Sequence, residues 1–201
     1  MTRAETTEFL TATLVRDKLS DRKYFAREVT LDYGTRHPKR VDVMQFSPAG
    51  VTYPSDNEKG VFVCYEVKSC IEDVYSGHVL NFFGEKNYIV TTMKTWKRLQ
   101  EDLRSDKFTD FLKNGHPGSS SYFGVMALVP GSVALNDTQA LFEEFLHPTP
   151  LSCNKDWHFS TPMPCRQGPR RRSMNELLFA MLRAKHSETN AEDIVCHFFT
   201  G

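Results

Sequence analysis

The 201-residue sequence predicts an α/β (α+β) protein in which a mixed β-sheet is flanked by helices. Three strand-like runs between residues 23 and 69 follow one another through turn-like segments, as hairpin-joined antiparallel strands do. Two later runs, at 88–93 and 122–129, are separated by a helical pattern, which is typical of parallel strands. A sheet that combines both kinds of connection is mixed.

The first half of the chain accounts for the antiparallel part of this sheet. A capping box at Thr2–Glu5 begins a helix whose apolar residues recur at helical spacing as far as Leu19. Runs rich in β-branched and aromatic residues then predict strands at 23–31, 40–46 and 60–69. The following segment, 69–83, reads as an amphipathic or irregular stretch.

The second half begins with the strand at 88–93. A helix follows it, with Trp96, Leu99 and Leu103 on its buried face and a kink at Ser105–Asp106. The run at 122–129 is almost entirely apolar, as expected for a strand that is covered on both faces.

The C-terminal part changes character. Residues 1–130 form the predicted core, and 131–201 form an extension. Five prolines between 131 and 169 predict an irregular arm, and a capping box at Ser173 begins a helix over 173–185 that packs on the core. The arm contains four possible zinc ligands, namely Cys153, His158 and Cys165 with His147 as the fourth. Their spacing contains no CxxC pair, so an irregular arm without zinc is favoured.

The composition of the chain limits the partners and the compartment that can be expected. The net charge is zero, so any site for a polyanion has to be a local patch. No apolar run approaches the length of a membrane span, and no signal peptide is visible, which predicts a protein without membrane contact. Five irregularly spaced cysteines fit a reducing cytoplasm better than a disulfide framework.

Charged residues in the strand at 60–69 point to a site. Glu66 and Lys68 are two positions apart, so their side chains project from one face of a strand that is otherwise apolar. On an antiparallel neighbour, Asp42 would lie beside Glu66. The alternative is an edge strand whose charges meet water. Two neighbouring carboxylates repel unless a cation lies between them, and Mg²⁺ or Mn²⁺ suits such oxygen ligands.

Asp42, followed on the next strand by Glu66-Val67-Lys68, resembles the signature of the PD-(D/E)XK nuclease superfamily. The run Lys68–Val74 is similar to one in its MmcB-like DNA-repair branch. The resemblance covers roughly residues 1–130, and Val41 stands where the name-giving proline would be. It implies a restriction-endonuclease-like αβββαβ core.

The same resemblance implies a metal-dependent deoxyribonuclease that works in DNA repair, recombination or the processing of phage or mobile-element DNA. Its metal ligands would be Asp42, Glu66 and the carbonyl of Val67, and Asp42, Glu66 and Lys68 would be catalytic. Two alternatives stay open: a non-catalytic DNA-binding accessory protein with a nuclease-like fold, and a structural ion-pair triad.

Further residues are candidates for the surroundings of this site. The additional candidates are Glu8 on the first helix, Glu28 on the first strand, and Asp73 and His78 after the third. Each has an ordinary structural reading, for example a cross-strand partner of Arg27 or Arg40 for Glu28. Arg170, Arg171 and Arg172 stand just before the C-terminal helix, where they predict contacts to DNA phosphates; a solvated basic turn is the alternative.

Overall fold

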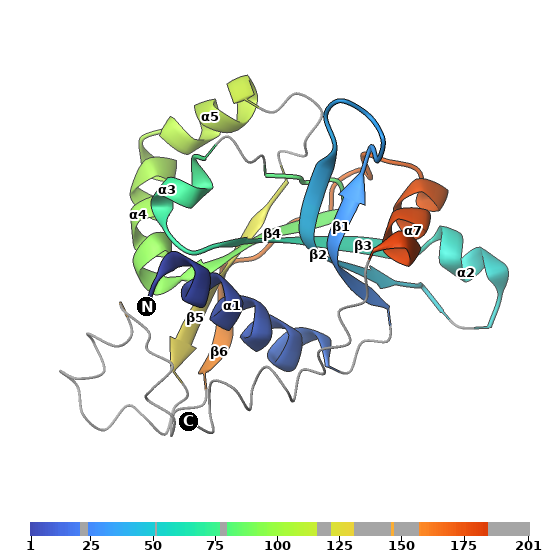
Figure 1. Cartoon of the computed structure of the whole chain (residues 1–201), viewed down its shortest axis with the longest axis horizontal. Coiled ribbons are helices and arrows are strands. Elements are labelled where there is room, and N and C mark those ends of the chain that lie inside the picture. The colour runs from blue at the N-terminus through green and yellow to red at the C-terminus, as the bar shows by residue number, and fades with distance from the viewer. Residues whose placement is uncertain are drawn as a thin grey trace.

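The computed structural model contains one six-stranded sheet flanked by helices (Figure 1). It describes residues 1–20, 24–50, 52–76, 80–115, 122–130, 146 and 157–184. The strands are β1 (Phe25–Leu31), β2 (Lys39–Ser47), β3 (Val61–Lys68), β4 (Lys86–Thr92), β5 (Gly124–Pro130) and β6 (Trp157–Met163). The helices are α1 (Arg3–Leu14), the π-helical turn η1 (Val15–Leu19) that continues it, α2 (Pro54–Glu58), α3 (Ile71–Val74), α4 (Met93–Arg104), α5 (Lys107–Gly115) and α7 (Met174–Arg183).

The sheet is mixed, as the sequence predicts. Its strands lie in chain order from β1 to β6. The pairs β1–β2 and β2–β3 are antiparallel, whereas β3–β4 and β4–β5 are parallel. The class of the protein, α+β with a helix-flanked mixed sheet, is therefore confirmed.

The sixth strand corrects the prediction of an irregular arm. β6 lies inside the stretch 131–169 and pairs antiparallel with β5 at one edge of the sheet. Its residues Trp157 and Phe159 are buried in the same apolar cluster as residues of α1. The sheet thus continues beyond residue 130. The helix predicted over 173–185 is α7, which packs on β1 at the opposite edge (Figure 1).

The two faces of the sheet are covered differently. On one face, α1 and η1 pack against alternate residues of β3, namely Val63, Tyr65 and Val67. The other face carries two separate apolar clusters. One joins β1–β3 to α7 and includes Phe62 and Cys64, and the other joins β4 and β5 to α3, α4 and α5. Because side chains alternate, Glu66 and Lys68 belong to this second face, next to the junction of its two clusters.

Local signals in the sequence set several boundaries. The capping box between Thr2 and Glu5 is present at the start of α1. The predicted kink at Ser105–Asp106 separates α4 from α5, and Asp106 has a φ of 59°, which ends the first helix. None of the helices in the described ranges has the length and apolar character needed to cross a membrane.

Candidate metal-dependent active site

Glu66 and Lys68 are buried near the carboxyl end of β3. Their side chains are 2% and 8% exposed, and Lys68 Nζ lies 4.0 Å from Glu66 Oε2. β3 is a central strand between β2 and β4, so the alternative of an edge strand with water-facing charges is wrong. A buried carboxylate and ammonium at the limit of ion-pair distance satisfy each other only weakly.

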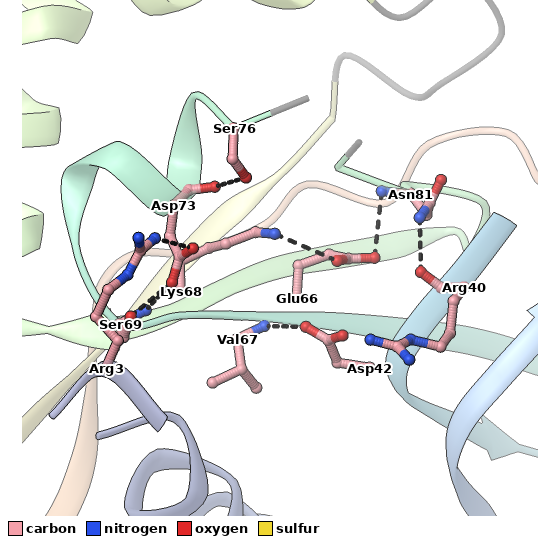
Figure 2. Close-up of polar contacts among 10 residues, drawn as sticks. All are labelled: Arg3, Arg40, Asp42, Glu66, Val67, Lys68, Ser69, Asp73, Ser76 and Asn81. Carbon is pink, nitrogen blue, oxygen red and sulfur yellow. Dashed lines mark hydrogen bonds and ion pairs between the residues drawn. The ribbon is translucent and has the colours of Figure 1, made fainter. Parts of the chain in front are cut away.

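Asp42 comes to the same place from β2. The β2–β3 register pairs Val43 with Tyr65, and one further step along it places position 42 opposite Glu66. The backbone N–H of Val67 donates a 2.8 Å hydrogen bond to Asp42 Oδ2 (Figure 2). The carboxylate of Asp42 therefore binds the β3 backbone at the point where the described pairing of the two strands ends.

Burial and repulsion hold both carboxyl groups toward their protonated forms. Burial raises the pKa of Glu66 well above its usual value, the nearby Asp42 raises it further, and Lys68 offsets only part of this. Burial also raises the pKa of Asp42, partly offset by the hydrogen bond from Val67 and by the charges of Lys68 and Arg40. A bound cation would favour the ionised forms of both carboxyl groups, because its charge offsets their burial and the negative charge beside them.

Asn81 completes one side of the site. Its backbone N–H donates to Glu66 Oε1 at 3.2 Å, and its side-chain Nδ2 donates to the carbonyl of Arg40 at 2.6 Å (Figure 2). Its Oδ1 is buried and has no hydrogen-bond partner among the residues that the structure describes. Figure 2 shows this oxygen on the side of the amide that faces away from Glu66 and Asp42, so it does not face an ion held between the two carboxylates.

Arg40, like Asn81, is near the carboxylates although it is not among the site residues predicted from the sequence. Its guanidinium lowers the pKa of both Asp42 and Glu66, and Figure 2 shows it directed toward the Asp42 carboxylate. It also forms a 2.8 Å ion pair with Glu28. Glu28 thus has the cross-strand partner that is the alternative to a site role. Its φ is 54°, and the register of β1 with β2 skips this residue.

Asp73 lies at the rim of the site rather than beside the carboxylate pair. It accepts hydrogen bonds from the backbone N–H and the hydroxyl of Ser69, and it forms an ion pair with Arg3 (Figure 2). Burial would raise the pKa of Asp73, but these hydrogen bonds and the charge of Arg3 outweigh it and lower the pKa. These contacts tie α1 to the loop after β3.

The remaining acidic, histidine and cysteine candidates that the structure describes do not join the site. Glu8 is exposed on α1. His78, His147 and Cys153 lie outside the described residues. His158 is exposed on β6, and Cys165 accepts a hydrogen bond from the backbone N–H of Asn87. Within the described ranges, no group of three or more His, Cys, Asp and Glu side chains could hold a metal ion, so a zinc site receives no support there.

Two of the three predicted phosphate-binding arginines are bound within the protein. Arg170 pairs with Glu85 at 2.5 Å, donates to the carbonyl of Gly60 and lies over the ring of Phe62. Arg172 pairs with Asp32 at 2.8 Å and with Glu176 at 3.1 Å.

Arg171 differs from its two neighbours. Its side chain is exposed and has no ion pair with any residue in the described part of the chain. Arg170 and Arg172 therefore form ion pairs that connect the start of α7 to the rest of the fold. Of the three arginines, only Arg171 has a guanidinium available to a phosphate.

The donor set fits a hard divalent cation. The carboxylates of Asp42 and Glu66 are oxygen donors, which Mg²⁺ and Mn²⁺ prefer. The N–H and C=O of one strand residue point to the same side, so the carbonyl of Val67 faces β2 and Asp42 as its N–H does. The two carboxylates and this carbonyl are the candidate ligands.

Comparisons with known protein families, with curated proteins and with solved structures find no match to this chain. The geometry of the site is therefore what supports a function.

Proposed function

We propose that this protein is a metal-dependent nuclease that hydrolyses phosphodiester bonds of DNA. The observation that carries the proposal is that two strands bring Asp42 and Glu66 together, with Lys68 on the same face as Glu66. This is the arrangement that the resemblance to PD-(D/E)XK nucleases implies. The resemblance also motivates a role in DNA repair, recombination or the processing of mobile DNA.

The proposed cation site consists of oxygen atoms from neighbouring elements. Asp42 and Glu66 would hold a Mg²⁺ or Mn²⁺ ion, with the carbonyl of Val67 as a further donor. When bound, the ion supplies a Lewis acid that polarises the phosphate and lowers the pKa of water.

The protein groups supply position and charge. The hydrogen bond from Val67 to Asp42 fixes one carboxylate, and the hydrogen bond from Asn81 fixes the other. Lys68 would orient the attacking water and stabilise the negative charge that grows on the phosphate oxygens. Burial of Glu66 and Lys68 strengthens these electrostatic effects, because little solvent screens them.

A cleavage assay tests the proposal. The protein is incubated with Mn²⁺ and a panel of labelled duplex, single-stranded and branched DNA, beside Lys68→Ala and the exposed-lysine control Lys113→Ala. We expect cleavage by the wild type and by Lys113→Ala, and loss of cleavage in Lys68→Ala. If no DNA form is cut, or if Lys68→Ala cuts like the wild type, the nuclease proposal is wrong. A structural triad or a non-catalytic accessory protein would then remain.

A further inference from the structure

A cavity lies beside the candidate site, between the β1–β2 hairpin and α7. It has a volume of about 580 Å³, within the range of small-ligand sites. Its lining combines arginines, one aromatic ring and small residues: Arg27, Glu28, Thr30, Tyr33, Arg40, Ala180, Arg183 and Ala184. Three arginines against one glutamate make it a local basic patch on a chain whose net charge is zero.

Arg40 connects this cavity to the carboxylates. It lines the cavity, and its charge also acts on Asp42 and Glu66. A DNA strand whose backbone reached Asp42 and Glu66 could therefore place its next phosphate beside Arg40. Arg27 has no carboxylate partner among the described residues, which leaves its guanidinium for a phosphate.

Tyr33 and Arg183, which line the cavity, form a stacking platform, and Phe179 lies next to Arg183 outside the lining. Tyr33 is 72% exposed and Phe179 is 61% exposed. The guanidinium of Arg183 lies 4.4 Å from the ring centre of Tyr33 and 5.4 Å from that of Phe179. A hydrogen bond of 3.1 Å to the carbonyl of Thr30 holds Arg183 in place. Flat, exposed and positively charged groups of this kind stack on nucleobases.

An unpaired base can present its face to such a platform, whereas a base inside a duplex is stacked on both sides. We propose that this cavity binds an unpaired nucleotide next to the cleaved bond, with its base on Tyr33 and Arg183 and its phosphate near Arg27 and Arg40. This deepens the proposed function and rests on it: the substrate class becomes DNA with a single-stranded segment, such as an overhang or flap.

Binding without metal tests the cavity separately from the chemistry. Fluorescence anisotropy in EDTA compares a duplex that carries a single-stranded overhang with a blunt duplex, for the wild type, Tyr33→Ala, Tyr33→Phe and Arg27→Ala. The matched controls are Tyr53→Ala, since Tyr53 is 68% exposed and is not part of the cavity lining, and Arg104→Ala, an exposed arginine of α4.

We expect the wild type to bind the overhang more tightly than the blunt duplex, by about five-fold or more. Tyr33→Ala should remove this preference, whereas Tyr33→Phe and both controls should keep it. Arg27→Ala should reduce the log–log salt dependence of overhang binding by about 0.7, the slope that one phosphate neutralised on a single strand contributes. Thermal denaturation of each variant establishes that it is folded.

The inference is overturned if the two DNA forms bind equally, or if Tyr33→Ala binds like the wild type. Its failure is distinct from failure of the nuclease proposal. Binding that depends on Tyr33, without any cleavage in Mn²⁺, would refute the nuclease and keep the cavity. Cleavage without dependence on Tyr33 would do the reverse.

Discussion

The protonation of Glu66 is the feature of single residues with the clearest consequence. Its pKa is raised in the folded protein, so the protonated form stabilises the fold. This contribution is fully present below the pKa of Glu66 in the unfolded chain and is lost as the pH rises through the folded-state pKa. Asp42 contributes in the same direction, whereas Asp73, whose pKa is lowered, stabilises the fold at higher pH.

Glu66→Gln should therefore stabilise the metal-free protein at neutral pH and weaken the loss of stability with rising pH. Glutamine keeps the shape of the side chain and an acceptor for the Asn81 N–H, and removes the repulsion with Asp42. Melting temperatures in EDTA across a pH series measure the effect, about 2–4 °C for each kcal/mol gained. The exposed Glu72, changed to Gln, is the control. A lower melting temperature in Glu66→Gln would show that a structural ion pair with Lys68 dominates.

Lys68 should affect cleavage more than it affects the binding of the metal. Lys68→Met removes a positive charge from beside the carboxylates, so the affinity for Mn²⁺ should stay or rise. Cleavage should fall by about 10²-fold or more if Lys68 acts on developing charge. Calorimetric titration with Mn²⁺ and single-turnover cleavage separate the two effects, with Lys113→Met as the control. Loss of metal binding together with cleavage would place Lys68 in a structural role instead.

At the scale of elements, most of the strands and the proximity of Asp42 to Glu66 can be predicted from local pattern. The sequence predicts strands at 60–69 and 40–46, and the structure has β3 at Val61–Lys68 and β2 at Lys39–Ser47. Strand alternation and the order of β2 and β3 are sufficient to bring Asp42 and Glu66 together. These features depend on neighbours in sequence or on a single hairpin.

The features that the sequence does not reveal depend on distant partners. β6 contains Pro162 and has exposed residues between buried ones, a pattern that fits an edge strand but is weak when its partner is unknown. Arg170 and Arg172 pair with Glu85 and Asp32, which are far away in the chain. No spacing rule connects such residues.

The ion pairs of Arg170 and Arg172, just before α7, should contribute to stability. Arg170→Ala would leave the buried carboxylate of Glu85 without its partner, at a cost of about 3 kcal/mol in the free energy of unfolding. The neighbouring Arg171→Ala should change it by less than about 0.5 kcal/mol, because its side chain is exposed. Urea denaturation of both variants measures the difference. Equal, small effects would mean that the ion pair with Glu85 does not hold the helix in place.

At the scale of the whole molecule, the extension after residue 130 is part of the fold. β6 pairs with β5 and buries Trp157, and α7 covers the apolar face of β1–β3. A chain that ends at Pro130 would lose both and expose the edge of the sheet. We expect it to lack cooperative unfolding by circular dichroism. A chain that ends after Ala184 keeps all these contacts and should unfold cooperatively; a cooperative 1–130 fragment would show that the predicted core is autonomous.

The central claim is that Asp42 and Glu66 bind one divalent cation together. The most direct measurement is calorimetric titration of Mn²⁺ into the wild type at several pH values, beside Glu66→Gln and Glu72→Gln. Since the ion must displace the proton that the raised pKa holds on Glu66, the affinity of the wild type and of Glu72→Gln should increase with pH. Glu66→Gln should bind weakly and show little of this pH dependence. If the wild type does not bind Mn²⁺, or binds it as Glu66→Gln does, the carboxylate pair is not a metal site and the account is contradicted.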